Sequence, residues 1–273
     1  MKSFSGFRAY LIEEEKSALT VEKYLRDTRK FLLWLGDRAL TKGETLKYKS
    51  ELTETYAVAS VNSMLSSVNT FLSFLGRGDC RVKTVRQQRR VFVSKDRELT
   101  RTEYERLIKA AKGNRRLCLL MQTICCTGIR VSEHRFITVE AARAGYAEVR
   151  LKGKLRTVFL PKRLCKALLA YAKERHIRTG SVFVTAAGKP LDRCNIWAEM
   201  KKLCTAASVQ REKVFPHNLR HLFARIHYSM EKDIVRLADI LGHASVDTTR
   251  IYTMESGEVH RRQIEKMPLI LIT

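Results

Sequence analysis

Six side chains in four short segments have the types and spacing needed to act together on a phosphodiester. The first arginine follows a glycine just after a predicted helix end, and the lysine lies at the predicted tip of a β-hairpin. The histidine and arginine of an HxxR segment share one face of a predicted helix, because they are about one turn apart. The six residues are Arg130, Lys152, His217, Arg220, His243 and Tyr252.

The chemistry that suits this set is phosphoryl transfer. Arginine presents a planar, permanently charged fork that matches two phosphate oxygens, and histidine and lysine can donate further hydrogen bonds. Such donors stabilise the negative charge that builds on the non-bridging oxygens of a pentacoordinate phosphorus. A tyrosine hydroxyl can act as the nucleophile and hold the phosphodiester as a covalent ester. Because the free pKa of tyrosine is about 10, Tyr252 needs a cationic, hydrogen-bonded site.

Other kinds of catalytic site are poorly supported. The sequence has no glycine-rich loop ending in GK[ST], no HExxH segment and no carboxylate cluster suited to magnesium. This argues against a metal-dependent nuclease or polymerase, and we expect neither a cofactor nor a metal. Taken singly, the HxxRH segment is compatible with structural histidines, and Tyr252 with a core position. The functional interpretation depends on the ordered combination.

That combination resembles the tyrosine recombinases, also called phage-type integrases, over nearly the whole chain. The similar segments are TGIRVSE (127–133), KGKLRTVFLP (152–161), FPHNLRHLFA (215–224) and LADILGHASVDTTRIYT (237–253). The resemblance implies that the six residues form the active site, with Tyr252 as the nucleophile. The hairpin is one residue shorter than many in the family. If the missing residue belongs to the turn, Lys152 fits best as the general acid, and Lys154 is the alternative.

Three further residues lie in or beside these segments: Glu133, His134 and His221. Glu133 is expected to orient Arg130. His134 stands where the family usually has an apolar residue, and it is expected on a helix exterior, the default place for a lone histidine. His221 is expected to support the site from behind, without a chemical role of its own.

The resemblance implies site-specific recombination of duplex DNA. Tyr252 would attack a scissile phosphate to form a 3′-phosphotyrosyl link, Lys152 would protonate the departing 5′ oxygen, and His217 would exchange a proton with Tyr252. The two arginines and His243 would hold the non-bridging oxygens. Resealing by the 5′-hydroxyl of a partner strand would give exchange through a Holliday junction. The alternatives are a type IB topoisomerase-like enzyme that relaxes DNA and a non-catalytic DNA-binding protein on the same fold.

The implied partners are double-stranded DNA with a specific recombination site and, in this family, a homotetramer on two duplexes. We expect a cytoplasmic, nucleoid-associated protein of a bacterial cell. The chain starts almost at once with helices, which leaves no room for an additional arm-binding domain. This favours a Xer-like recombinase or the integrase of a small mobile element. The apolar terminus over 267–272 is compatible with packing on its own core or on a neighbouring protomer.

The elements that must position these side chains are mostly helices. Helices with one apolar face are predicted over 20–36, capped by Thr20, and over 60–76. Weaker helices are expected over 3–17 and 44–57.

The second part of the chain begins with a clear helix start, because Thr100 and Glu103 can form a capping box. A buried helix follows over 117–126. Alternating apolar and polar residues predict a hairpin over 147–160, and a short strand is expected over 182–184.

The predicted fold class is therefore mainly α with a small antiparallel sheet. We expect a helical, SAM-like core-binding domain over 1–80, a basic interdomain linker over 81–97 and a mixed α/β tyrosine-recombinase catalytic domain over 98–273. In the family, two such domains would form a C-shaped clamp around DNA.

The charge of the chain points to a polyanionic partner. The 273 residues include 52 Lys and Arg against 28 Asp and Glu, a formal net charge of +24. No apolar run approaches the roughly 18 residues of a membrane span, so no membrane partner is expected. The seven cysteines form no CxxC pair and are predicted to be buried free thiols. Residues expected to contact DNA are Lys83, Arg86, Arg89, Arg90 and Lys95 of the linker and Lys154 of the hairpin.

Overall fold

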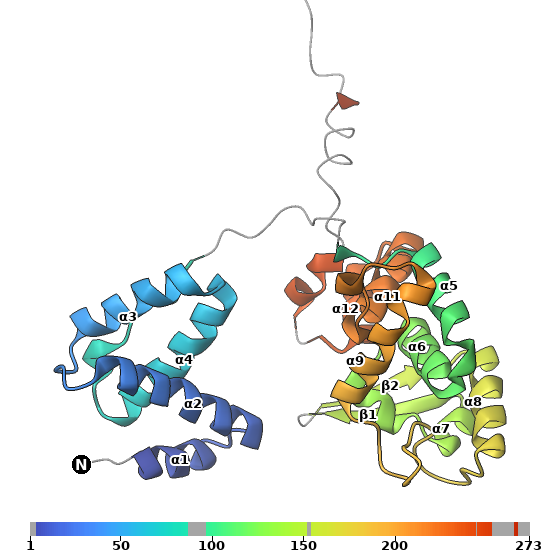
Figure 1. Cartoon of the computed structure of the whole chain (residues 1–273), viewed down its shortest axis with the longest axis horizontal. Helices are drawn as coiled ribbons and strands as arrows, with labels where there is room; N and C mark the ends of the chain where they lie inside the picture. The colour runs from blue at the N-terminus through green and yellow to red at the C-terminus, as the bar shows by residue number, and fades with distance from the viewer. Residues whose placement is uncertain (1–3, 87–96, 152–153, 244, 253–264, 267–273) are drawn as a thin grey trace, which may run out of the picture. The chain divides into compact units, whose positions relative to one another are not determined.

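A computed structural model describes residues 4–86, 97–151, 154–243, 245–252 and 265–266, without the side chains of Ser5, Leu151 and Lys154. The chain divides into two compact units, residues 1–89 and 90–273. Both are largely helical, and the second contains a two-stranded antiparallel sheet (Figure 1). The predicted fold class, mainly α with a small antiparallel sheet, is confirmed.

The N-terminal unit contains the helices α1 (Phe4–Glu13), α2 (Ala18–Leu35), α3 (Lys42–Thr55) and α4 (Val58–Phe74). The helices α2 and α4 pack along their apolar faces, and Phe31 and Leu65 are fully buried between the helices. Helix α2 begins earlier than predicted. The Ser17 hydroxyl, and not that of Thr20, caps it, because Ser17 Oγ accepts a hydrogen bond from the Thr20 backbone N–H at 3.4 Å.

The C-terminal unit is built around α6. Its helices and strands are α5 (Arg101–Ala110), α6 (Arg115–Thr127), α7 (Val139–Ala144), β1 (Tyr146–Leu151), β2 (Lys154–Phe159), α8 (Lys162–Glu174), α9 (Arg193–Lys202), α10 (Cys204–Ala207), α11 (Pro216–Glu231) and α12 (Ile234–Leu241). Helix α6 packs against α8 and α11, and Leu120, Met121 and Ile124 of α6 are fully buried. None of the helices in the described part of the chain is long and apolar enough to cross a membrane.

The hairpin that carries the predicted lysines pairs Val149 with Arg156 and Leu151 with Lys154. Lys152 and Gly153 join the two strands and lie outside the described residues. One face of the hairpin supplies Val149 and Val158 to the core.

The short strand predicted over 182–184 does not form. Val184 makes only an isolated bridge to Pro190, and Thr138 makes another to Ser181. Phe183 is fully buried in the core. The apolar run therefore reflects side-chain packing of an irregular segment, because a short apolar sequence does not by itself specify strand pairing.

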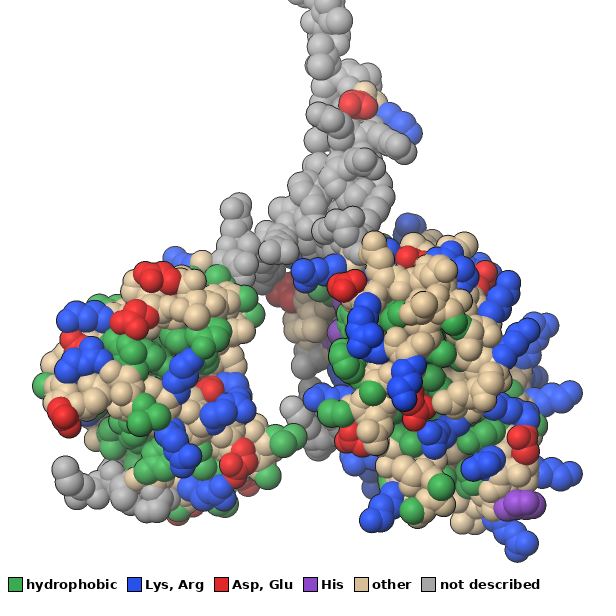
Figure 2. Space-filling view, in the orientation of Figure 1, with side chains coloured by type: hydrophobic (Ala, Val, Ile, Leu, Met, Phe, Trp, Pro, Cys, Tyr) green, Lys and Arg blue, Asp and Glu red, His purple; other side chains and the backbone are tan. Residues whose placement is uncertain are grey.

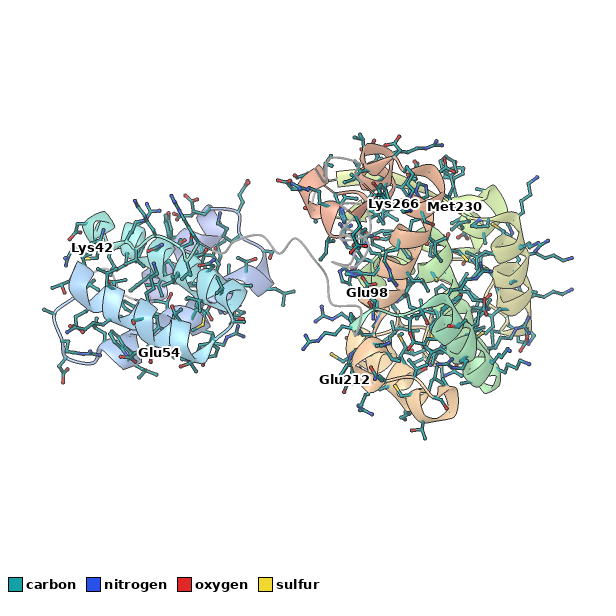
Figure 3. All side chains as sticks on the ribbon, turned by 90° about the horizontal axis from the view of Figure 1, so that it is seen from above. Lys42, Glu54, Glu98, Glu212, Met230 and Lys266 are labelled. Carbon is teal, nitrogen blue, oxygen red and sulfur yellow. The ribbon has the colours of Figure 1, made fainter. Side chains whose placement is uncertain are left out.

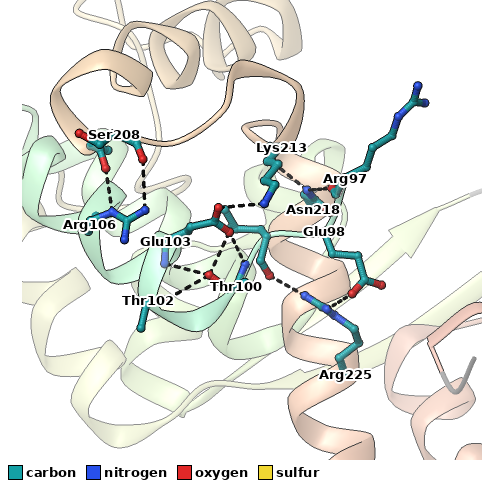
Figure 4. Close-up of polar contacts among 12 residues, drawn as sticks. Arg97, Glu98, Thr100, Thr102, Glu103, Arg106, Ser208, Lys213, Asn218 and Arg225 are labelled. Atoms are coloured by element: carbon teal, nitrogen blue, oxygen red, sulfur yellow. Dashed lines mark hydrogen bonds and ion pairs between the residues drawn. The ribbon is translucent and has the colours of Figure 1, made fainter. Parts of the chain in front are cut away.

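Arg97 and Glu98, the first described residues of the C-terminal unit, are tied to α11 (Figure 4). Thr100 and Glu103 form the predicted capping box at the start of α5. Asn218 Nδ2 donates to the Arg97 carbonyl at 2.8 Å, and Arg225 pairs with Glu98. The capping box is thus part of a larger network that fixes where the chain enters this unit.

Two predictions about burial are corrected. His134 is only 4% exposed and lies beside the Phe183 ring, so it is an interior residue and does not sit on a helix exterior. The seven cysteines are free thiols, but Cys126 and Cys194 are exposed. Cys118, Cys125 and Cys165 are half-buried, so the prediction of buried thiols holds fully only at Cys80 and Cys204.

Candidate active site

Five of the six predicted side chains surround one surface pocket of about 440 Å³. Its lining residues are Arg130, His217, Arg220, His221, His243, Asp247, Thr248, Ile251 and Tyr252. They come from the segment after α6, from α11, from the end of α12 and from two short 3₁₀ helices, Val246–Thr248 and Arg250–Tyr252. Lys152 lies outside the described residues, and of Lys154 only the backbone is described, at the start of β2.

The turn after α6 delivers Arg130 to the pocket. Gly128 ends α6 with a φ of +66°, in the left-handed region. A Cβ atom at this position would lie 2.5 Å from Cδ1 of the Phe223 ring on α11. Glycine is therefore needed for both the backbone conformation and the close approach of α11.

Arg220 is the most enclosed cation of the pocket, with 1% of the residue exposed. Its Nη1 donates to the Gly128 carbonyl at 2.5 Å, and its Nη2 donates to the Leu241 carbonyl at 2.7 Å. Burial, together with the nearby charge of Arg130, lowers the pKa of Arg220 to about 10. The guanidinium consequently keeps its charge at neutral pH.

Arg130 and Arg156 share the carboxylate of Glu133, which is 1% exposed. Glu133 Oε1 lies 3.1 Å from Arg130 Nη1, and Glu133 Oε2 lies 2.6 Å from Arg156 Nη2. Glu133 Oε2 also accepts the Arg130 backbone N–H at 2.7 Å. Arg156 reaches further, to the carbonyl of Ile240 near the end of α12. One buried carboxylate thus connects the turn after α6, strand β2 and α12.

His243 is held at both ring nitrogens. Its Nε2 lies 2.9 Å from Arg220 Nη2, and its Nδ1 lies 2.8 Å from Thr249 Oγ1. Because a guanidinium can only donate, Nε2 is the acceptor and Nδ1 carries the proton donated to the Thr249 hydroxyl. Burial, and then the positive charge of Arg220, lower the pKa of His243 to about 4. The ring is therefore neutral at physiological pH.

The Tyr252 ring rests on a histidine pair. The ring centroids of Tyr252 and His221 are 4.9 Å apart, and those of His221 and His217 are 4.5 Å apart. Tyr252 is 6% exposed and also packs with Leu237 and Leu241. Burial lowers the pKa of His217, and it lowers the pKa of His221 to about 4. Both rings are neutral near pH 7, so either can accept a proton.

The composition of the pocket lining suits an anion. Two arginines and three histidines line it, and Asp247 is the only carboxylate among the lining residues. Within the residues that the structure describes, no group of three His, Cys, Asp or Glu side chains is arranged to hold a metal. Arginine forks in a partly enclosed pocket can bind two oxygens of one phosphate.

Two contributors to this site were missed in the sequence. Arg156 occupies an inward position of β2, opposite Val149, where an apolar residue is the usual choice. That break in the alternation was the available signal. Thr249 is fully buried and touches His243, and no local pattern marks it, because the contact depends on how the chain folds back after α12.

Comparison with known proteins matches both units. Residues 97–258 match the model described as "Phage integrase family", and residues 4–78 match "Phage integrase, N-terminal SAM-like domain". The chain is 30% identical over 275 residues to Tyrosine recombinase XerA of Thermococcus kodakarensis, covering 97% of this chain and 94% of that protein. A crystal structure of XerA recombinase shares 27% identity, with a TM-score of 0.55 over 98% of each chain.

A second solved structure is similar in fold. XerH site-specific recombinase, bound to palindromic difH substrate in a post-cleavage complex, gives a TM-score of 0.74 at 19% identity, covering 97% of this chain and 84% of that one. The family match extends over most of the C-terminal unit, including all the residues that line the pocket. The chain therefore belongs to the phage integrase family.

Proposed function

We propose that the protein is a site-specific DNA recombinase that cuts and rejoins duplex DNA through a 3′-phosphotyrosyl intermediate. The observation that carries this proposal is the convergence of two arginines, two neutral histidines and a tyrosine on one pocket. The named relatives, tyrosine recombinases of the Xer group, support the same activity. In the family's terms the units would be a core-binding domain over 1–80 and a catalytic domain over 98–273, joined by a linker over 81–97 whose first residues pack on the N-terminal unit.

Cleavage begins with attack of the Tyr252 hydroxyl on the scissile phosphate. The Tyr252 Oη–phosphorus bond forms as the bond from phosphorus to the 5′ oxygen breaks. His217 accepts the tyrosine proton, which its neutral state permits. Lys152 protonates the 5′ oxygen, with Lys154 as the alternative general acid. Attack by the 5′-hydroxyl of the partner strand reverses these steps and reseals the DNA.

The two arginines hold the non-bridging oxygens of the phosphorane. Arg220 is already fixed by backbone carbonyls, so little reorganisation is needed when negative charge develops. His243 donates to a non-bridging oxygen as its Nε2–H tautomer, which forms when Arg220 Nη2 turns its hydrogen from Nε2 to the phosphate. The Thr249 hydroxyl permits this change, because it can donate to Nδ1 as readily as it accepts. Glu133, Arg156 and Thr249 are positioning residues in this scheme.

The assembly and the setting follow from this chemistry. Strand exchange would require a homotetramer on two duplexes that each carry the recombination site, with a Holliday junction between the two exchanges. We place the protein with the chromosome, in the cytoplasm and associated with the nucleoid, as a Xer-like resolvase or the integrase of a small mobile element. Neither a metal nor an organic cofactor is required by these steps.

Trapping the covalent intermediate tests the proposal. The binding site is first identified by footprinting the protein on the DNA that flanks its gene. The protein is then incubated with a nicked suicide duplex that carries this site. An SDS-stable protein–DNA band is expected from the wild type and not from Tyr252→Phe. Equal bands from both proteins would assign the nucleophile elsewhere. Relaxation of plasmids that lack the site, without strand exchange, would indicate a topoisomerase.

A further inference from the structure

We infer that residues 81–86 form a phosphate-binding strip, which two asparagines of α4 fix to the N-terminal unit. This inference rests on the proposed function, because duplex DNA is the partner it assigns to the strip. The sequence predicts that this segment is the start of an interdomain linker. In the structure its Val82 is 4% exposed and belongs to the core of the N-terminal unit.

Two side-chain amides hold the strip by paired hydrogen bonds. Asn69 Nδ2 donates to the Val82 carbonyl at 2.8 Å, and Asn69 Oδ1 accepts the Val82 N–H at 3.0 Å. Asn62 repeats the arrangement at Val85, with distances of 3.0 Å to the carbonyl and 2.8 Å to the N–H. Each amide therefore binds one residue as a neighbouring β-strand would, through both its donor and its acceptor.

The spacing explains why both pairs form together. Seven residues separate Asn62 from Asn69, which is about two helical turns or roughly 10.5 Å of rise. Three extended residues from Val82 to Val85 span about 9–10 Å. The strip thus runs antiparallel to α4 with a matching repeat. Arg81, directly before this span, has extended dihedral angles, φ −64° and ψ 143°.

Because Val82 and Val85 face the core of the N-terminal unit, the basic side chains of the strip face the solvent. Arg81, Lys83 and Arg86 are exposed. Lys49 Nζ binds the Lys83 carbonyl at 2.9 Å and adds another cation beside the strip. Lys42, near the amino end of α3 (Figure 3), joins Arg81 and Lys83 in lining a hollow of about 440 Å³.

The cations of this strip are not neutralised by neighbouring carboxylates. Within residues 4–86, no ion pair involves Lys42, Arg81, Lys83 or Arg86. By contrast, nearby Arg38 and Lys47 pair with Glu44, and Arg77 pairs with Asp79. A row of unpaired cations on a fixed backbone matches the phosphates of a duplex, which bind basic side chains without reading sequence. Fixing the backbone also removes part of the ordering cost of binding.

Binding at several salt concentrations tests the strip. Full-length variants are titrated against a fluorescein-labelled duplex of mixed sequence, followed by fluorescence anisotropy. If both side chains contact phosphates, the double variant Lys83→Gln/Arg86→Gln should reduce the slope of log K against log salt by roughly 1.8. The matched control is Lys166→Gln/Lys173→Gln, two exposed charges on α8, which should leave the slope unchanged. Equal slopes for the two double variants would overturn the inference.

The asparagine contacts are tested without changing any charge. Asn62→Ala/Asn69→Ala should reduce the salt slope toward that of the lysine–arginine variant. A folded asparagine variant with wild-type affinity and slope would contradict the fixing role. Hydrogen exchange of the wild type gives an independent result, because the Val82 and Val85 amides should exchange more slowly than the Thr84 amide. Equally fast exchange at all three would also contradict it.

These outcomes are separable from failure of the proposed function. At low salt and saturating protein, the strip variants should still give the SDS-stable band on the suicide duplex. A wild type without that band would overturn the recombinase assignment and leave the salt-slope result standing. Normal cleavage together with an unchanged salt slope in Lys83→Gln/Arg86→Gln would instead contradict the inference about the strip and leave the recombinase assignment standing.

Discussion

Arg220 donates to the carbonyl oxygens of Gly128 and Leu241, which lie at the ends of two different helices. These carbonyls carry the partial negative charge of a helix C-terminus, so they stabilise a buried guanidinium. The same two contacts fix its orientation before DNA arrives. At this scale, the rate of cleavage should depend as much on neighbours such as Thr249 and Arg156 as on the groups that would touch phosphate.

Thr249 is the residue whose hydroxyl permits His243 to carry its proton on either ring nitrogen. Thr249→Val keeps the shape and removes the only hydrogen bond to Nδ1 among the described contacts. We expect cleavage to slow roughly 10-fold, as for one lost hydrogen bond of about 1–2 kcal/mol, with DNA binding unchanged. Single-turnover cleavage and anisotropy measure the two effects. Thr249→Ser should restore the rate, and a Thr249→Ser variant as slow as Thr249→Val would refute the hydroxyl's role.

Arg156 is expected to stabilise the C-terminal unit through Glu133. Arg156→Gln leaves a carboxylate that is 1% exposed with one fewer cation, and we expect a loss of about 3 kcal/mol in the free energy of unfolding. Arg156→Lys should lose less, because it retains the charge. The control is Arg150→Gln on β1, where an exposed pair 3.6 Å from Glu148 should contribute less than about 1 kcal/mol. Equal losses for Arg156→Gln and Arg150→Gln in urea unfolding would exclude this role.

At the scale of elements, several residues of the active site lie at the ends of helices. Arg130 follows the end of α6, His243 follows the end of α12, and Tyr252 closes a 3₁₀ helix. Such ends carry local signals, which is why the glycine after α6 and the Thr100 capping box were predictable from sequence.

Features that depend on contacts distant in sequence were not predictable. The strip over 81–86 has only two inward residues, Val82 and Val85, so no periodicity marked it as part of a core. The inward position of Arg156 makes sense only when Glu133, 23 residues away, is brought beside it. In both cases a polar partner on another element decides the structure, and local propensity does not.

Gly128 tests the importance of one helix end. Gly128→Ala would place a methyl group 2.5 Å from the Phe223 ring at a φ of +66°, and we expect a loss of about 1–3 kcal/mol in the free energy of unfolding. Cleavage should slow as well, because the Gly128 carbonyl holds Arg220.

Gly145→Ala is the matched control for that variant. Gly145 also ends a helix in the left-handed region, with a φ of +82°, but nothing lies within 4 Å of the position of its Cβ. Gly145→Ala should therefore lower the free energy of unfolding by only about 1 kcal/mol, which is the cost of placing alanine in the left-handed region, and cleavage should be normal. If both alanine variants unfold at the same urea concentration, the contact with Phe223 is not what requires a glycine at 128.

At the scale of the whole molecule, the histidines are divided unequally between the two units. Lys and Arg side chains are spread over the visible face of the C-terminal unit (Figure 2), and all seven histidines of the chain also lie in that unit. Side-chain hydrogen bonds hold the described segments on either side of the connection between the two units. Asn62 and Asn69 hold residues 81–86, and Asn218 and Arg225 hold residues 97–99. The segment that joins them, 87–96, is outside the described residues.

This division predicts that mild acid destabilises one unit and spares the other. The pKa values of His221 and His243 are lowered to about 4 in the folded protein, against about 6.5 when unfolded. Between these values the unfolded chain binds more protons, so the stability of the C-terminal unit should fall as the pH drops from 7.5 to 5.5. The contribution of His243 is reduced because this side chain is partly exposed and solvent screens its charge. We therefore expect the free energy of unfolding of the C-terminal unit to fall by about 1–2 kcal/mol, which lowers its Tm by a few degrees.

The two tryptophans allow each unit to be followed separately in the full-length chain, since Trp34 lies in the first unit and Trp197 in the second. Trp34→Phe leaves Trp197 as the reporter, and its thermal transition should shift down between pH 7.5 and 5.5. Trp197→Phe leaves Trp34, whose transition should stay in place, because the N-terminal unit has no histidine and its carboxylates titrate at lower pH. Equal shifts of both transitions would show that the acid response does not arise from the buried histidines of the active site.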